Sequence, residues 1–438
     1  MSTTAPILAA DGTSVPAGDI ERLRRLAARK AEIATDPINL ERREMWLRHD
    51  AGTGSRPMVL AEIGGVRDCA RAVIDTDLTC EHDWARGLER GLRSQIYQFD
   101  ILQDDHVVEP RQCVSWQART SDYGVEVVQH HPDFEGSLGA RRWDPPLTDL
   151  PADLDRLRPR TFSVDRASTH AEVERLEAAI GDLLDIEIRG GFWWTLGMTW
   201  TAIELIGLEG LMLAMYDAPA ALHGLMGFLR DDAIAYARWL EAEELLCLNN
   251  EDDYIGSGSM GYTHELPDSR HTDSGHTGAD HTGPVRTVDQ WALLESQETV
   301  GVSPELFGEF ILPYQLDVAR LFGRIYYGCC EPVDSRIHLL RQLPNLARIS
   351  VSPWADEAAM ADACGTQIVY SRKQNPTLIS TEVFDEAAIR ADLLTTLETA
   401  ADCRVELVMK DVHTLSEQPE RLPRWVALAR EAIDTIHG

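Results

Sequence analysis

Two adjacent cysteines and a glutamate, Cys329, Cys330 and Glu331, are the residues whose types and spacing point most directly to chemistry. They end an apolar run, residues 324–328, that is typical of a buried strand, and Pro332 stops further strand pairing. Neighbouring side chains on a strand point to opposite faces, so one thiol at most enters a given pocket. Thiolate combined with carboxylate or imidazole is a typical zinc ligand set, and zinc with an open position activates a substrate heteroatom or thiol. We therefore predict Cys329 as the leading metal ligand, with Cys330 and Glu331 beside it; a buried structural cysteine is the alternative.

Other polar side chains follow further segments that the sequence predicts as strands. Such residues converge on one edge of a parallel sheet, so we assign the substrate contacts to them. The predicted substrate-binding residues are Asn250, Asp253, Glu295, Glu298, Trp354, Lys373 and Asn375. The predicted catalytic residues are Glu331, His413 and Lys410. Glu331 or His413 would move a proton, and the lysines would place an anionic group, although ion pairing with neighbouring carboxylates is the plain alternative.

The elements that must position these residues alternate between strand and helix. Strands are predicted at 324–329, 347–351, 367–370 and 404–409, and a predicted helix follows each of them. Repeated strand–helix units with short connections form a parallel sheet. At 438 residues, an α/β fold of the closed (β/α)8 TIM-barrel type with insertions accommodates the chain, and its site lies at the C-terminal mouth. No Gly-x-Gly-x-x-Gly motif follows an early strand, which disfavours a dinucleotide-binding fold.

The domain organisation is predicted as an N-terminal extension over residues 1–56 and a barrel domain over 57–438. Residues 58–62 are predicted to be the first strand of the barrel, and further strands are predicted at 96–100 and 244–248. Residues 254–287 are polar and rich in glycine, and they contain four histidines without His-x-His or His-x3-His spacing. This pattern favours a lid-like insertion over a metal cluster.

Composition narrows the classes of partner. The formal net charge is −31, which argues against nucleic acid or an anionic membrane, because phosphate binding needs clustered lysine and arginine. Residues 1–19 lack the basic and apolar regions of a signal peptide, and no run of about 18 apolar residues is present. The eight cysteines are scattered, so we expect free thiols and a cytoplasmic location. The expected partner is a small-molecule substrate, and a homo-oligomer is left open.

The segment 327–331, Tyr-Gly-Cys-Cys-Glu, preceded by 302–310, Val-Ser-Pro-Glu-Leu-Phe-Gly-Glu-Phe, and by Pro313, resembles the uroporphyrinogen decarboxylase superfamily. The similarity covers roughly residues 180–436 and is greatest to the branch of cobalamin-dependent methyltransferases. It implies a (β/α)8 barrel whose methyltransferase members bind zinc through a His-x-Cys and a later cysteine. In those members a separate corrinoid protein carries the methyl group.

Residue by residue, Cys329 matches the first cysteine of that motif. Tyr327 stands where the family has histidine, and Lys410 or Asp411 stands near the position of the last cysteine. His413 or Glu331 would then replace the missing ligands. The decarboxylase branch fits less well, because residues 46–52 lack its Arg-Gln-Ala-Gly-Arg type loop.

The resemblance therefore implies an enzyme that transfers a methyl group between a small substrate, such as an O-methyl compound, and a corrinoid cofactor or protein. Zinc and cobalamin are the implied cofactors, and the corrinoid-carrying protein is the implied partner. Two alternatives remain open from the same residues. One is a cofactor-independent decarboxylase of a small carboxylic acid, and the other is a catalytically degenerate member that binds a ligand without turnover.

Overall fold

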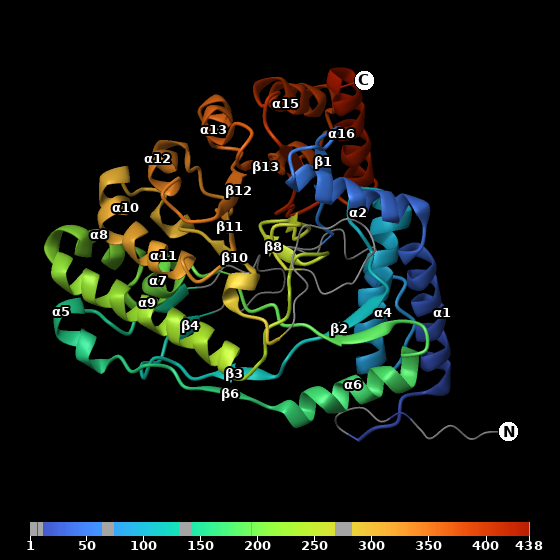
Figure 1. Ribbon diagram of the computed structural model, residues 1–438, viewed down its shortest axis with the longest axis horizontal. Helices are drawn as coiled ribbons and strands as arrows, with labels where there is room; N and C mark the ends of the chain where they lie inside the picture. The colour runs from blue at the N-terminus through green and yellow to red at the C-terminus, as the bar shows by residue number, and fades with distance from the viewer. Residues whose placement is uncertain are drawn as a thin grey trace.

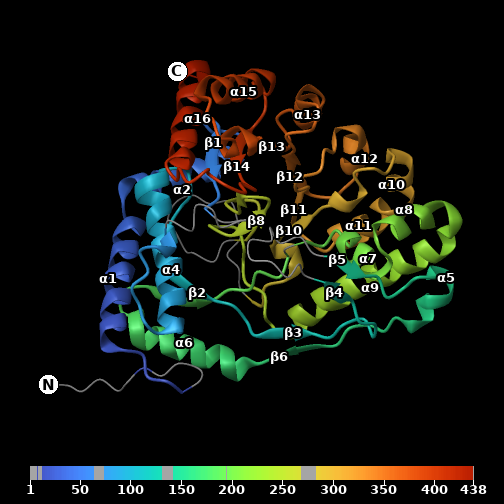
Figure 2. The same cartoon turned by 180° about the vertical axis from the view of Figure 1, so that it is seen from behind.

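A parallel sheet of six strands carries most of the residues singled out above (Figure 1). The computed structural model describes residues 7, 12–63, 74–130, 142–193, 195–267 and 283–437. In spatial order the strands are β1 (Met58–Ala61), β14 (Val405–Met409), β13 (Val369–Lys373), β12 (Leu346–Val351), β11 (Arg324–Tyr327) and β10 (Trp291–Leu294). The first strand of the chain thus pairs with the last, and Figure 2 shows β1 beside β14 and α16 from behind.

The strands have two buried faces, which explains their nearly continuous apolar sequences. On β14, Leu407 and Met409 point to the outer helices, whereas Glu406 and Val408 point to the inside of the sheet. The helices that cover the outer face are α10 (Pro304–Phe310), α11 (Leu312–Ala319), α12 (Ile337–Leu340), α13 (Glu357–Cys364), α14 (Thr377–Ser380), α15 (Glu386–Thr399) and α16 (Arg421–His437).

Side-chain caps place the starts of several of these helices. Ser303 accepts the main-chain N–H of Leu306 at the start of α10, and Asp356 and Asp385 cap α13 and α15 in the same way. Such caps satisfy N–H groups that have no partner within the helix. They fix where each helix begins, and therefore how far the preceding loop reaches over the sheet edge.

The N-terminal half forms a second layer of helices and short strand pairs. Its helices are α1 (Ala17–Ala34), α2 (Pro37–Asp50), α4 (Asp83–Tyr97), α5 (Leu150–Asp153), α6 (Arg166–Ile180), α7 (Thr199–Ile206), α8 (Leu208–Asp217) and α9 (Pro219–Ala242). A π-helix, η1 (Gln98–Leu102), follows α4, and the 3-10 turn η2 (Leu154–Arg156) follows α5. The second half of the chain has the 3-10 turns η3 (Thr287–Asp289), η4 (Gln297–Thr299) and η5 (Asp334–Arg336). The strand pairs are β2 (Arg111–Val114) with β7 (Asp185–Ile188), β3 (Ala118–Thr120) with β6 (Phe162–Val164), and β4 (Val128–His130) with β5 (Arg142–Asp144).

The prediction of an α/β fold with a parallel sheet is confirmed, but the closed barrel is not: within the described residues the six-stranded sheet stays open. Side chains form hydrogen bonds with main-chain groups of both edge strands, β1 and β10. On β1, the carboxylates of Asp105 and Asp104 accept the N–H groups of Val59 and Ala61 at 2.7 and 2.8 Å. On β10, the side chain of Asn249 bonds both the N–H and the C=O of Trp291. These bonds occupy main-chain groups that a further strand would otherwise pair.

Two other strand predictions are wrong. Residues 96–100 continue α4 into η1, because the apolar positions of that helix repeat at helical spacing before the segment begins. Residues 244–248 form no ladder, although their backbone leads into Asn249 beside β10. No described helix is long and apolar enough to cross a membrane.

The described part of the segment 254–287 packs against the inner face of the sheet, the face opposite the helices α10–α16. It does not cover the C-terminal edge of the sheet. It forms the hairpin β8 (Tyr254–Gly256) and β9 (Ser259–Met260), which lies in the middle of the molecule in both views (Figures 1 and 2). Arg348, fully buried on β12, donates to Ser259 Oγ at 2.6 Å and to the carbonyl of Met260 at 2.7 Å. His271, His276 and His281 lie outside the described residues, so the lid-like role stays a prediction for that part alone.

The extension predicted over residues 1–56 packs into the same interior. Trp46 and Leu47 share a hydrophobic cluster with Met58 of β1 and Val408 of β14. Asp50 is buried and lies 3.1 Å from the guanidinium of Arg348. The boundary at residue 56 stays a prediction, but the helices before it contribute directly to the inside of the sheet.

Gly258, in the turn of the hairpin, gives a test of this close packing. Its φ is +92°, and a Cβ there would lie 2.5 Å from Val408 Cγ1 and 3.2 Å from Glu62 Oε1. We expect Gly258→Ala to lower the free energy of unfolding by about 1–3 kcal/mol, because it adds a clash and a strained backbone. Urea unfolding measures the change. Gly87→Ala, in α4 with open space around it, is the control and should stabilise by about 0.5–1 kcal/mol; equal effects of the two substitutions would contradict the packing.

Candidate functional site

The loop after β11 carries the two cysteines, and hydrogen bonds from both sides hold it. Gly328 begins it with φ +95°, and a Cβ there would lie 3.1 Å from the Cβ of Ser350. Ser350 and Ser352 of the neighbouring β12 segment donate to the carbonyls of Cys329 and Cys330 at 2.5 and 2.7 Å. This fixed backbone places both thiols at the C-terminal edge of the sheet.

The side chain of Glu331 fixes this loop to the segment that follows β10. Its carboxylate is buried and accepts the main-chain N–H of Cys329 at 2.8 Å and that of Ser296, after β10, at 3.1 Å. Burial raises the pKa of Glu331 to about 7, although these hydrogen bonds act against the rise. With both oxygens engaged by main chain, Glu331 acts as a positioning residue rather than as the predicted proton carrier or metal ligand.

The two thiols have different environments despite their adjacency. Their sulfur atoms are 3.6 Å apart, and the Cys330 sulfur also lies 3.0 Å from Asp411 Oδ2, so the single Cys330 proton lies between a sulfur and a carboxylate acceptor. Lys410 Nζ lies 3.9 Å from Cys329 Sγ. The hydrogen bond from Cys330, and after it the Lys410 charge, lower the pKa of the Cys329 thiol to about 6 against the effect of burial. The same hydrogen bond raises the pKa of Cys330, so Cys329 is the thiolate of the pair at neutral pH.

Lys410 is the cation of the site. It is 5% exposed, and its ammonium donates to Ser257 Oγ in the hairpin turn at 3.1 Å and lies 3.7 Å from Asp411 Oδ2. Burial by itself lowers a lysine pKa, but Glu62, Cys329 and Asp411 outweigh it and raise the pKa of Lys410. The site therefore contains a thiolate and an ammonium side by side, both shielded from bulk water.

Lys373 lies deeper, inside the sheet. Its ammonium donates to the Tyr326 hydroxyl at 2.8 Å and to Ser371 Oγ at 2.6 Å. Burial lowers the pKa of Lys373 to about 8. Its side chain is used within the interior hydrogen-bond network, so its predicted contact with substrate has no support in this geometry.

Glu295 and Glu298 form a carboxylate cluster with Glu331 beyond the end of β10. Thr195 donates to Glu295 at 2.8 Å and Thr199 donates to Glu298 at 2.6 Å. Burial, and then the charges of Glu298 and Glu331, raise the pKa of Glu295 to about 8. Glu295 therefore holds a proton more readily than an ordinary carboxylate, although Thr195 and the main-chain N–H of Gln297 donate to its two oxygens.

The remaining predicted residues do not join this cluster. Asn250 donates to the carbonyl of Pro267, and Asp253 is ion-paired with Arg189 at 2.7 Å beside a separate cavity of about 350 Å³. Trp354 is 68% exposed, and Asn375 bonds the N–H of Thr377 at the start of α14. His413 is exposed and makes no hydrogen bond or ion pair with the described part of the chain.

Four residues of the site were not among the predicted catalytic, substrate-binding or metal-binding residues, although Asp411 was named near the position of the family's last cysteine. Glu62 follows β1 and accepts the Tyr254 hydroxyl at 2.9 Å, and Ser257 and Asp411 contact Lys410. Glu62 and Asp411 follow strands, so their positions alone could have identified them. Tyr254 and Ser257 belong to the hairpin, and nothing in their local sequence places that hairpin inside the sheet.

Zinc is the metal that the resemblance implies, and the donor atoms allow a test of its fit. Zinc needs three or four nitrogen, sulfur or oxygen donors at about 2.0–2.3 Å. Within the described residues, no group of three or more His, Cys, Asp or Glu side chains could hold a metal ion. Lys410 instead brings a fixed positive charge to Cys329, and Glu331 is engaged by main chain. The described residues do not fit zinc, which stays an implication of the resemblance.

Comparison with known proteins adds little to this picture. No model of a protein family matches the chain, and no curated protein matches it. Among solved structures, the chain is similar to a methyltransferase from Methanosarcina mazei, with 12% sequence identity and a TM-score of 0.48. The likeness covers 89% of this chain and 98% of that one. A likeness at this identity and TM-score does not bear on activity.

Thiol reactivity tests the electrostatics of the site directly. We expect iodoacetamide at pH 7 to modify Cys329 before the other described cysteines, because the thiolate is the nucleophile and burial raises the pKa of Cys113, Cys247, Cys364 and Cys403. The rate should rise with pH through a midpoint near 6, which is the pKa of Cys329. Lys410→Met should move that midpoint upward. Peptide mass spectrometry locates the label, and a midpoint above 8 in the unaltered protein would refute the paired thiolate.

Proposed function

We propose that this protein is a methyltransferase whose reacting centre is the Cys329 thiolate beside the Lys410 ammonium. The observation that carries the proposal is the position of this ion pair, with 3.9 Å between Sγ and Nζ, at the C-terminal edge of a parallel sheet. That edge is where enzymes of this architecture keep their chemistry. The methyl donor or acceptor on the other side would be a corrinoid carried by a partner protein, as the resemblance of residues 327–331 implies.

The chemistry follows from the charges. A methyl group leaves its donor without the bonding electrons, so the fragment left behind gains negative charge. Lys410 is the cation that would stabilise this fragment and donate a proton to it. The Cys329 thiolate, with Glu62 and Asp411, keeps Lys410 charged, and it presents a soft anion to the methyl carbon as that carbon becomes electron-poor. A corrinoid, when bound, would supply the cobalt that exchanges the methyl group.

The substrate that fits this centre is a small molecule. The atom from which its methyl group departs is uncharged or anionic. An O-methyl compound meets that description, because its oxygen becomes an alkoxide that Lys410 can protonate. Ser257 and Tyr254 in the hairpin border the same space, as their contacts with Lys410 and Glu62 indicate.

The test is an assay of methyl exchange with cobalamin. Methylcobalamin is incubated with the protein and a panel of thiol and phenol acceptors, and its absorbance spectrum reports loss of the methyl group. The reverse reaction uses reduced cobalamin and methylated phenols. Protein-dependent exchange supports the proposal. Release of carbon dioxide from small acids without cobalamin would replace it with the decarboxylase alternative, and ligand binding without either reaction would indicate a degenerate member.

A further inference from the structure

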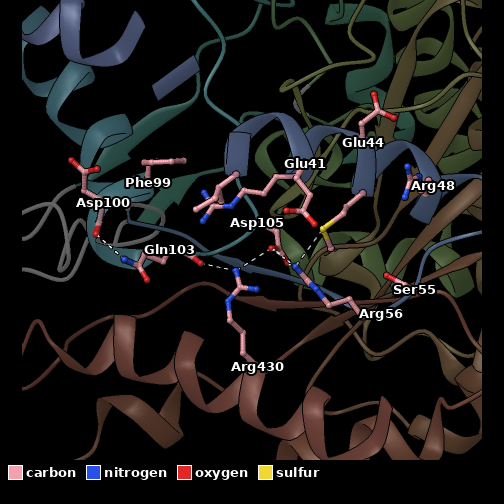
Figure 3. A pocket seen from close by; sticks show the side chains of 13 residues that line it. Glu41, Glu44, Arg48, Ser55, Arg56, Phe99, Asp100, Gln103, Asp105 and Arg430 are labelled. Carbon is pink, nitrogen blue, oxygen red and sulfur yellow. Dashed lines mark hydrogen bonds and ion pairs between the residues drawn. The ribbon is translucent and has the colours of Figure 1, made fainter. Parts of the chain in front are cut away.

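The polar cavity before β1 is accounted for by ion pairs within the fold. Its volume is about 780 Å³, and four arginines and four carboxylates are among the residues that line it. Figure 3 shows Arg56 and Arg430 converging on the buried carboxylate of Asp105, which accepts from them at 2.8 and 3.0 Å. The charges that line this cavity therefore balance one another.

The loop after β11 is different, because it places two oxidisable atoms side by side. The sulfur atoms of Cys329 and Cys330 are 3.6 Å apart, although successive side chains of a strand point to opposite faces. The strand ends at Tyr327, and Gly328 has a φ of +95°, so the pair lies beyond the regular alternation. Both sulfurs therefore face the same space, and a short approach of one to the other is what a bond between them needs.

The charged neighbours of the two sulfurs give them different roles. Lys410 Nζ lies 3.9 Å from Cys329 Sγ and favours its thiolate, which is the form that attacks a peroxide. Asp411 Oδ2 lies 3.0 Å from Cys330 Sγ, where a carboxylate can accept the proton of that thiol. Both cysteines are partly exposed, so a small oxidant reaches them. A thiolate with a second thiol beside it is the arrangement typical of redox-sensing cysteines.

We infer that Cys329 and Cys330 are a site of reversible oxidation, at which hydrogen peroxide joins their two sulfur atoms in a disulfide. The Cys329 sulfur attacks one oxygen of the peroxide and the O–O bond breaks. This gives the sulfenic acid of Cys329 and a hydroxide, which takes a proton from Lys410 and becomes water.

The second step closes the disulfide. The Cys330 thiol gives its proton to Asp411, and its sulfur attacks the Cys329 sulfur. The S–O bond breaks, and the hydroxide that leaves takes the proton from Asp411 and becomes the second water. Two electrons have then passed from the sulfurs to the peroxide, and Lys410 recovers its proton from solvent.

The disulfide formed in this way is strained and therefore easily reduced. Successive Cα atoms are about 3.8 Å apart, whereas disulfides usually join Cα atoms about 4.4–6.8 Å apart. Ser350 and Ser352 also hold the carbonyls of the two cysteines at 2.5 and 2.7 Å, which limits how far the backbone can adjust. Strained disulfides have the more oxidising potentials of the labile, regulatory class. A small cellular thiol such as glutathione should therefore reopen the bond.

The disulfide would change the site in two ways. It removes the anion beside Lys410, and it ends the contact between Cys330 and Asp411. Methyl transfer would then stop on oxidation and return on reduction, a consequence that rests on the proposed function. The oxidation itself is independent of that function, so a chemical readout tests it even if the protein transfers no methyl group.

Mass spectrometry of the full chain treated with hydrogen peroxide is that readout. The reduced protein receives one equivalent of peroxide, is alkylated with iodoacetamide and is digested with trypsin. The tryptic peptide 325–336 contains Cys329 and Cys330 and no other cysteine. We expect this peptide to lose two hydrogen atoms and to take up no alkyl group, and to take up two alkyl groups after treatment with glutathione. Phenylarsine oxide, whose trivalent arsenic bridges neighbouring thiols, should block both cysteines of the peptide in the reduced protein only.

Three substitutions separate the roles of the two sulfurs. Cys330→Ser should stop at the sulfenic acid of Cys329, which dimedone traps, because the second thiol is absent. Cys329→Ser should slow the oxidation of Cys330 by roughly 10-fold or more, because the remaining thiol is mostly protonated. Cys403→Ser removes a half-buried thiol before β14, at the other edge of the sheet, and should form the disulfide as the unaltered protein does.

The unaltered protein alone can overturn the inference, so the test does not depend on how the variants fold. A peptide 325–336 that still takes up two alkyl groups after peroxide would do so. A disulfide from Cys329 or Cys330 to a third cysteine would do the same. Equal trapping by dimedone in the unaltered protein and in Cys330→Ser would also overturn it, because the second thiol would then not react with the sulfenic acid.

Discussion

Cys329→Ser is expected to lose methyl transfer by roughly 10³-fold or more while remaining folded. A serine hydroxyl stays neutral at pH 7, so Lys410 loses the anion that lies 3.9 Å from its ammonium and is left with Glu62 and Asp411. The methyl carbon also loses the soft anionic sulfur that faces it in our proposal. The measurement is the rate of methylcobalamin consumption under single-turnover conditions, with circular dichroism to confirm the fold.

Two other cysteines provide matched controls for that loss. Cys330→Ser keeps a hydroxyl donor beside Cys329 and should lower the rate by less than about 10-fold. Cys403→Ser removes a half-buried thiol just before β14, at the other edge of the sheet, and should not change the rate. A Cys329→Ser protein with more than a tenth of the original activity would show that the thiolate is not part of the reacting centre.

Arg348→Met should produce the largest loss of stability among the substitutions considered. Arg348 is fully buried on β12 and bonds the hairpin at Ser259 and Met260, and it lies 3.1 Å from Asp50 of α2. Removing it leaves the carbonyl of Met260 buried without this donor and breaks the ion pair with Glu406. We expect the free energy of unfolding to fall by about 3–5 kcal/mol, as for a broken buried ion pair.

Urea unfolding monitored by circular dichroism measures this change. The control is Arg320→Met, whose ion pair with Asp317 is on the surface and should contribute less than about 1 kcal/mol. The loss of the hairpin should also expose Lys410 to solvent, because Ser257 in the hairpin turn accepts its hydrogen bond. A cost below about 1 kcal/mol for Arg348→Met would show that the hairpin is held in the sheet by apolar packing alone.

The local sequence already determined the second half of the fold. Short apolar runs bounded by polar residues predicted β11, β12, β13 and β14, and the structure places these four strands side by side in parallel. Parallel strands share one C-terminal edge, so Cys329 and Lys410, 81 residues apart, were predicted in one place and lie 3.9 Å apart. This part succeeded because strand periodicity and helix caps are properties of neighbouring residues.

The rest depends on contacts between distant segments, which spacing along the chain does not encode. The sheet stays open because Asp104, Asp105 and Asn249 satisfy its edges, and a carboxylate or amide reads as an ordinary loop residue in the sequence. The hairpin at 254–260 has the polar, glycine-rich composition of a surface loop, yet Arg348 and Glu406 hold it inside the sheet. Those partners also bring Ser257 to Lys410. The sequence by itself therefore determined most strands of the sheet and the edge at which the reactive side chains lie. The tertiary structure decided that the sheet stays open, which segment packs against its inner face and which groups pair with each charge. Burial and pairing depend on contacts across the whole chain, and local sequence patterns do not encode them.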